Sequence, residues 1–449
     1  MTSEIASNAW RGSHALRLMQ VLCREVGPRP SGSAAIAEAR KLLANEFASF
    51  GAVGVHEEEV PVRRWHPGTP LLVLLGTFER EYACVQCLFT AAADIEAPLV
   101  DAGSGTDEDF TRVGCTARGA AALIGGQAIS GGKFTPVQAR IASACNAGCS
   151  AVILRSTAPT GLPAIEAVGL QTDAALPCLS VSSETGSELA SAAESGTAKV
   201  HIRTTGASEP AVCANLIADL APDDGANETI VLGAHLDSFW NAPGALDNLT
   251  GVVAAVEIAR LLSPFRPAFR RTLRLIAYTG EEIGCLGSKS YIARQTDGLD
   301  GVRFVVNMDS LFPATARGTA VMWSAQMCDH IRRAFGDAGR DVDVRNLFCM
   351  SSDYLPFMLQ GIPVCRPADW ENSMPIWWHT ESDDLEHVSI DWIRQNAMVY
   401  AQLLARMLTD PEPLPAKRLS PAEVRGRLEE EGVVEWLRLQ GHQVPERCD

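Results

Sequence analysis

The sequence predicts an α/β protein in which a mixed, mostly parallel sheet is sandwiched between helices. Within residues 212–410, near-continuous apolar strand patterns alternate with helical patterns, which is typical of a sheet covered on both faces. Residues 64–205 instead carry short apolar runs between Gly-rich turns, which indicates an inserted, β-rich domain. The 449 residues are 47% hydrophobic and 20% charged. A chain of this composition can bury a large core, so disorder is excluded.

The N-terminal segment is predicted to supply helices and one strand. A helix should begin near Ser31 or Ser33, because apolar side chains recur at helical spacing from Ala35 to Phe47. Gly51 is a suitable residue to end it. The strand "AVGVHEEEVPV" follows at residues 52–62. These elements place residues 1–63 in the same domain as the later α/β region.

Residues 64–205 differ in character from both flanks. Runs such as "LLVLLG", "AAALIGG" and "SAVILRS" predict short strands, and "TPVQARIASACNAG" predicts one amphipathic helix. We expect this segment (the inserted region) to form a separate small domain.

From residue 206 to 410, strand and helix patterns alternate. Together with residues 1–63, this segment is expected to form one discontinuous domain. The expected strands cover 228–238, 271–280 and 302–310, and the expected helices cover 247–262, 287–295 and 391–408. After a Pro-rich linker, residues 411–449 are expected to add a terminal helix that opens with the capping box Ser420–Glu423.

Composition limits the partners and the compartment. The formal net charge of −16 argues against nucleic acid and anionic membranes as partners. No segment reaches the ~20 apolar residues of a membrane span, and the first residues lack the apolar core of a signal peptide. The 13 cysteines show no framework spacing, and the Cys84–Cys87 pair has no second pair to complete a zinc site. Reduced, buried cysteines suit the cytoplasm, where we expect the protein to act.

Polar side chains gather where the predicted strands of residues 212–410 end. In an open α/β sheet, ligands bind at that edge. Each residue alone has an ordinary explanation, such as a helix cap, a turn or a solvated helix start. Their combination is the informative feature, because imidazole and carboxylate groups together are suitable ligands for zinc. The residues are His235, Asp237, Asp247, Glu281, Glu282, Asp309, His379 and Asp383.

The residue types match a site for two metal ions. Such a site needs a carboxylate that can give one oxygen to each metal, and Asp247 at a helix start is suited to that position. Glu281 and Glu282 leave the backbone in different directions, so one can bind a metal while the other acts as a general base. Asp237 lies two residues after His235, where its carboxylate could orient the imidazole.

These stretches resemble the family of co-catalytic zinc exopeptidases that includes bacterial leucyl aminopeptidases and the glutamate carboxypeptidase II type. The inserted region resembles the protease-associated domain of that family, notably in "LPCLSVSSETGSEL". The resemblance implies a zinc-exopeptidase α/β fold for residues 1–63 and 206–410. The matching stretches are "GAHLDS", "GALDNLTGV", "YTGEEIGCLGSKSY", "VVNMDSL", "SSDYLPFMLQGIPV" and "WHTESDD".

The resemblance also implies a cofactor of two Zn²⁺ ions and a ligand for each position. His235 and Asp309 would hold one zinc ion. Glu282 and His379 would hold the other, and Asp247 would bridge the two.

Three more residues align with catalytic positions of the family. Glu281 aligns with the general base and Asp237 with the carboxylate behind the first histidine. Tyr354 aligns where some members carry His and others Tyr, and its phenol could polarise the scissile carbonyl or stabilise the oxyanion.

The substrate pocket is less defined by the sequence. Trp240 and Trp378 lie beside site motifs and could line an apolar pocket, whereas Trp370 and Trp377 are expected to pack internally. Arg366 could meet a substrate carboxylate or form a structural ion pair. The inserted region and the terminal helix are both possible surfaces for a homodimer.

The first hypothesis is a peptidase that removes N-terminal residues from peptides, an aminopeptidase or dipeptidase. A carboxypeptidase and an amidase of a non-peptide amide would use the same metal ligands. A glutaminyl cyclase-like transferase would share the fold and the Trp378-His379-Thr380 sequence, but those enzymes usually read Asp-Ser at Asp247-Asn248 and use one zinc. A non-catalytic protein of the transferrin-receptor type would have lost ligands, and none is missing here.

Overall fold

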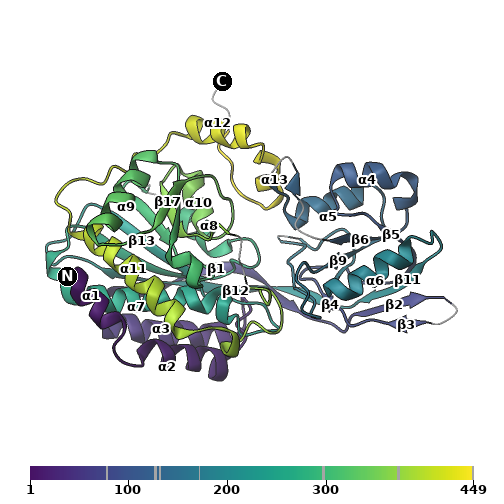
Figure 1. Cartoon of the computed structure of the whole chain (residues 1–449), viewed down its shortest axis with the longest axis horizontal. Helices are drawn as coiled ribbons and strands as arrows, with labels where there is room; N and C mark the ends of the chain where they lie inside the picture. The colour runs from purple at the N-terminus through teal and green to yellow at the C-terminus, as the bar shows by residue number, and fades with distance from the viewer. Residues whose placement is uncertain are drawn as a thin grey trace.

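The computed structural model describes residues 1–76, 79–125, 129–130, 133–170, 172–295, 299–371 and 375–446. Two eight-stranded sheets lie side by side (Figure 1). The long antiparallel strands β1 (Val53–His66) and β12 (Ala207–Leu220) belong to the first sheet and lead the chain into the second sheet and back. None of the described helices combines the length and the apolar character that crossing a membrane requires.

The first sheet is mixed, and four of its seven strand pairs are parallel. The predicted mixed sheet between helices is therefore confirmed. In spatial order its strands are β1, β12, β14 (Thr272–Tyr278), β13 (Thr229–His235), β15 (Val302–Asn307), β18 (Val364–Pro367), β16 (Gly318–Met322) and β17 (Asp343–Asn346).

Helices cover both faces of this sheet because its strands carry apolar side chains on both sides. In β13, Ile230 and Leu232 join one buried cluster, and Val231 between them joins the other. The helices on the first face are α1 (Thr2–Ala9), α2 (His14–Gln20), α3 (Ala34–Ser49), α7 (Thr250–Leu262), α9 (Ala325–Asp337) and α11 (Ile390–Thr409). On the second face lie α8 (Leu286–Arg294) and α10 (Tyr354–Leu359), and the C-terminal helices described below also pack there.

The local signals of the sequence are visible in these elements. The hydroxyl of Ser33 caps α3 by accepting a hydrogen bond from the Ile36 amide at 3.3 Å, and Gly51 follows the helix with a positive φ of 77°. Short irregular helices connect the main elements: η1 (Val21–Val26), η2 (Gly114–Ala117), η3 (Ala245–Leu249), η4 (Ser263–Ala268), η5 (Pro313–Ala316) and η6 (Leu385–His387).

The second sheet is built within the inserted region. That this segment is a protease-associated domain stays a prediction, as do the boundaries of the three predicted domains. Its strands in spatial order are β3 (Arg80–Glu81), β2 (Leu71–Leu75), β11 (Lys199–Thr204), β5 (Ala93–Asp101), β6 (Ala121–Gly125), β9 (Ala151–Arg155), β10 (Cys178–Val181) and β4 (Val85–Gln86). The helices are α4 (Asp107–Val113), α5 (Val137–Asn146) and α6 (Ser183–Ala193), and β7 (Ile129–Ser130) pairs with β8 (Lys133–Phe134).

The C-terminal segment packs on the protein body. The predicted capping box is present, because the Ser420 hydroxyl accepts from the Glu423 amide and the Glu423 carboxylate accepts from the Ser420 amide. α12 (Pro421–Glu431) and α13 (Val434–Leu439) bury Val424, Leu428 and Leu437 against the second face of the first sheet. α13 also contacts α5, so this segment touches both halves of the molecule (Figure 1).

Arg271 ties the start of β14 to the end of the covering helix α11. The side chain is 4% exposed. Its guanidinium donates to the Glu228 carboxylate at 2.7 Å and to the carbonyls of Met407 and Asp410 at 2.8 and 2.7 Å. These carbonyls are groups that the helix itself leaves without a partner, so Arg271 completes the end of α11.

We expect the substitution Arg271→Ala to lower the free energy of unfolding by about 2–4 kcal/mol, because it leaves buried carbonyls without a hydrogen-bond donor and creates a cavity. Urea denaturation of the metal-free chain measures this change. The neighbouring Arg270 is exposed, and Arg270→Ala should change stability by less than about 0.5 kcal/mol. Equal losses in the two variants would contradict the assignment.

Candidate metal centre

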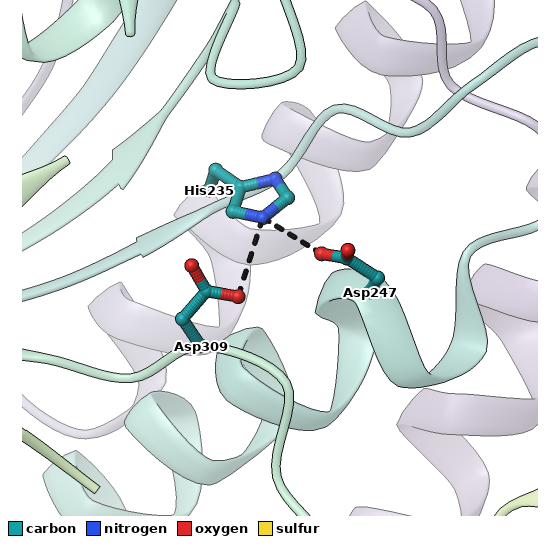
Figure 2. A group of neighbouring side chains, drawn as sticks. All are labelled: His235, Asp247 and Asp309. Atoms are coloured by element: carbon teal, nitrogen blue, oxygen red, sulfur yellow. Dashed lines mark hydrogen bonds and ion pairs between the residues drawn. The ribbon is translucent and has the colours of Figure 1, made fainter. Parts of the chain in front are cut away.

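Three of the predicted ligands form one group at the carboxyl ends of the parallel strands. His235 is the last residue of β13, Asp309 follows β15, and Asp247 lies in η3 just before α7. Figure 2 shows both carboxylates directed at the same imidazole nitrogen. The Nε2 atom of His235 lies 3.1 Å from Asp247 Oδ1 and 3.6 Å from Asp309 Oδ1.

A second group shares Asp247 with the first. The Nε2 atom of His379 lies 3.4 Å from Asp247 Oδ2 and 3.7 Å from Glu282 Oε2. Each oxygen of Asp247 therefore faces a different histidine. This is the arrangement that a carboxylate bridging two metal ions requires.

The donor atoms fit zinc. Zinc ligands at about 2.1 Å in tetrahedral geometry lie about 3.4 Å from one another. The four donor separations given above run from 3.1 to 3.7 Å. Asp247, Glu282 and His379 also line a small cavity next to the second group.

The bridging residue is held from two sides. The Asp383 carboxylate accepts hydrogen bonds from the amides of Leu246 and Asp247 at 2.6 and 3.0 Å. The indole of Trp378 donates to Asp247 Oδ2, and its ring stacks on His379 at a centroid distance of 3.6 Å. Trp378, predicted as a pocket residue, thus orients the shared carboxylate. Asp383 had no predicted role beyond its position beside His379.

Asn248 holds Asp309 in place. Its amide oxygen accepts from the Ser310 amide at 3.1 Å, and its amide nitrogen donates to the Met308 carbonyl at 2.9 Å. The close approach of α7 depends on Gly251, since a Cβ there would lie 2.3 Å from the Met308 carbonyl oxygen. The residues on both sides of Asp309 are therefore fixed to the start of α7.

Asp237 has a broader structural role than the sequence predicts. The Nδ1 atom of His235 lies 3.1 Å from the backbone carbonyl of Asp237 and 3.8 Å from its carboxylate. The carboxylate accepts the amides of Glu281 and Glu282 at 3.2 and 3.3 Å. It therefore fixes the turn that carries the predicted base and a predicted ligand, while the backbone carbonyl is the nearer partner of the imidazole.

Arg29 supports the loop that follows His235, although no spacing signal in the sequence singles it out. The side chain is fully buried. It donates to the carbonyls of Leu236 at 2.8 Å and Pro243 at 2.6 Å, and its own amide donates to the Ser238 hydroxyl at 3.0 Å. A charged, forked donor can brace several carbonyls of one loop at once.

Three further predicted residues lie around this centre. The hydroxyl of Tyr354 is buried and accepts from the Ser351 amide at 3.0 Å, so its role in polarising a carbonyl stays a prediction. The Nε atom of Arg366 is buried with no hydrogen-bond partner among the described residues. Trp240 is half-buried against the core of the first sheet. Substrate contacts by Arg366 and Trp240 stay predictions.

Burial dominates the ionisation of the acidic groups. It raises the pKa of Glu281 well above its ordinary value, and the nearby carboxylates of Asp309 and Asp353 add to the effect. It also raises the pKa of Asp353 and that of Asp383 to about 7. An acid with a raised pKa at a reactive centre is suited to taking up a proton.

The pKa values of His235 and His379 are both raised in the metal-free chain. Burial lowers the pKa of His235, but neighbouring acids, Glu281 first, outweigh it and raise the pKa well above the ordinary value. Burial likewise lowers the pKa of His379, and Asp247, Glu166 and Glu282 outweigh it. Protonated imidazoles thus neutralise carboxylates that metal ions would otherwise neutralise.

An α/β fold with two largely buried groups of imidazole and carboxylate ligands at its strand ends is typical of a metal-dependent enzyme. Comparison with family models makes this specific, because residues 215–404 match the model described as "Peptidase family M28". This matched segment contains all five predicted metal ligands. The predictions of a co-catalytic zinc peptidase family and of a metallopeptidase enzyme are thereby confirmed.

Individual proteins are similar to this chain in sequence or in fold along most of its length. The aminopeptidase YwaD of Bacillus subtilis (strain 168) is 26% identical over 429 residues, which cover 92% of this chain and 89% of the relative. The M28 peptidase precursor from Shewanella amazonensis SB2B has a similar fold, with a TM-score of 0.80, 20% identity and coverage of 93% and 98%. A zinc aminopeptidase from Bacillus subtilis gives a TM-score of 0.67, 23% identity and coverage of 90% and 96%.

The metal-free chain is expected to lose stability as the pH rises above about 6.5. The pKa values of His235 and His379 are raised in the folded state, so protonation of both imidazoles stabilises the fold below that pH. This stabilisation is lost as the pH rises through the pKa values of the folded state. The raised pKa values of Asp353 and Asp383 act in the same direction from about pH 4 to about 7. The lowered pKa of Asp247 has the opposite effect on stability, but only at acidic pH, below the ordinary pKa of an aspartate.

Zinc should remove this dependence, because it takes the place of the protons. Thermal unfolding of chelator-treated and zinc-loaded protein between about pH 5.5 and 8.5 tests the expectation. The gap between the two midpoints should widen with pH. A midpoint of the metal-free chain that rises over this range would contradict the expectation.

Proposed function

We propose that this peptidase removes N-terminal residues from peptides with the help of two zinc ions. The observation that carries the proposal is the pair of ligand groups that share Asp247. Relatives of this chain that bear the name aminopeptidase support the direction of cleavage. The site residues keep the roles that the family resemblance implies, with His235 and Asp309 on one zinc ion and Glu282 and His379 on the other.

Bound zinc supplies Lewis acidity, which lowers the pKa of water and polarises a carbonyl. Glu281 then takes a proton from the attacking water on its carboxylate. It passes this proton to the leaving amine as the C–N bond breaks, so one water is consumed for each bond. Asp237 holds the Glu281 amide at 3.2 Å, which fixes the base relative to the ligands.

The location and the inserted region belong to the same proposal. The cysteines that the structure describes are all free thiols, and most of them are buried, which supports a reducing cytoplasm. A protease-associated domain in the inserted region is supported by its separate sheet of β2 to β6 and β9 to β11.

A peptide with distinguishable ends tests the direction of cleavage. Glutaminyl-leucyl-phenylalanine with free ends is incubated with zinc-loaded and with chelator-treated protein and followed by mass spectrometry. We expect loss of the N-terminal residue in the zinc-loaded sample alone, because the attack depends on the metal. Loss of the C-terminal residue would replace the proposal by a carboxypeptidase, and loss of ammonia alone by a cyclase.

Substitution of the two adjacent glutamates should separate base from ligand. Glu281→Gln is expected to lower kcat about 10²- to 10⁴-fold with the zinc content unchanged, because only proton transfer is removed. Glu282→Gln, the matched control, is expected to lower the zinc content itself. Steady-state kinetics together with zinc analysis measure both effects. Full activity of metal-loaded Glu281→Gln would exclude Glu281 as the base.

A further inference from the structure

One nitrogen of His379 has no partner that the proposed function assigns. The Nε2 atom faces Asp247 and Glu282, whereas the Nδ1 atom is buried and lacks a hydrogen-bond partner among the described residues. Of the acidic groups that the structure describes, Glu166 is the nearest, and its Oε1 lies 3.8 Å from Nδ1. Glu166 belongs to the inserted region, not to the sheet that carries the ligands.

The backbone beside Glu166 already holds His379. The amide of Ile165 donates to the His379 carbonyl at 2.8 Å. The carbonyl of Glu166 accepts from the Leu88 amide at 3.0 Å, and Leu88 also forms a parallel bridge with Ala167. Residues 165–167 are therefore fixed to the inserted region on one side and to the metal ligand on the other.

The imidazole of His379 is confined in the remaining directions. The indole of Trp378 stacks on one face at 3.6 Å, and Phe239 meets the ring edge-on at 4.8 Å. The backbone of His379 has a positive φ of 60°, a conformation that side-chain-bearing residues rarely adopt without support. With the ring held in this way, Glu166 is the acidic group nearest to Nδ1 in the part of the chain that the structure describes.

We infer that Glu166 is a positioning residue that accepts the Nδ1–H of His379 and holds this ring for the second zinc ion. The inference rests on the proposed zinc site. A ligating histidine commonly donates its other N–H to a carboxylate, which fixes the tautomer and raises the basicity of the ligand. The Glu166 side chain is 36% exposed, so it is free to close the remaining distance by rotation. The inserted region thereby completes the metal centre.

Zinc affinity tests the inference without any peptide substrate. In chelator competition, wild-type protein should bind two zinc ions, and Glu166→Ala should bind one of them about 10- to 100-fold more weakly. Glu166→Gln keeps an acceptor oxygen and should lose less. Glu96 is exposed on β5 of the same inserted region, and the control Glu96→Gln should leave both affinities unchanged.

Two further readouts separate positioning from folding and from substrate binding. The visible spectrum of the cobalt-substituted protein should change in Glu166→Ala for one site, while the far-UV circular dichroism spectrum of the metal-free variant, which reports folding, stays at the wild-type value. Unchanged zinc affinities and spectrum would overturn the inference. So would a higher KM for peptides with a free N-terminus at unchanged zinc affinity, because Glu166 would then bind the substrate amine. Failure of wild-type protein to cleave any peptide would refute the proposed function instead, since the zinc readouts do not depend on cleavage.

Discussion

The buried carboxylate of Asp247 is the constraint around which the rest of the centre is arranged. A buried anion is costly unless cations or hydrogen-bond donors surround it. Here each oxygen faces an imidazole, an indole donates to one of them, and Asp383 fixes the backbone that presents the group. A side chain that must satisfy partners in several directions has little freedom to rotate. Its position therefore determines where the two ligand groups meet.

The sheet makes this arrangement possible because its parallel strands end at one edge. His235 ends β13, and the turns after β14 and β15 bring Glu281, Glu282 and Asp309 to the same place. The loops between them are long enough to move unless something ties them together. Asp237 and Asn248 provide those ties through backbone amides. Precise ligand positions in such a site come from the supporting hydrogen bonds as much as from the strands.

The sequence indicates which candidate ligands should lie together because their signals are local. Strand patterns place His235 and Asp309 at strand ends, and the residue types indicate the metal. The supporting contacts are less accessible. Arg29 and Glu166 lie 209 and 213 residues from their partners Ser238 and His379, and no short pattern marks either of them. Tyr354 lies at the start of α10 as its motif suggests, but the direction of its hydroxyl depends on the Ser351 turn.

The contacts of His379 couple metal binding to the docking of the inserted region on the first sheet. Its carbonyl is held by Ile165 of the inserted region, and its ring belongs to the ligand set of the first sheet. A metal ion that binds His379 therefore stabilises the docked orientation of the inserted region. Because linkage is reciprocal, docking of the inserted region makes the free energy of metal binding more favourable by the same amount. The C-terminal helices also contribute to this docking, since α13 packs on the first sheet and contacts α5. On the proposal that Glu166 accepts from His379, the inserted region takes part in holding the metal.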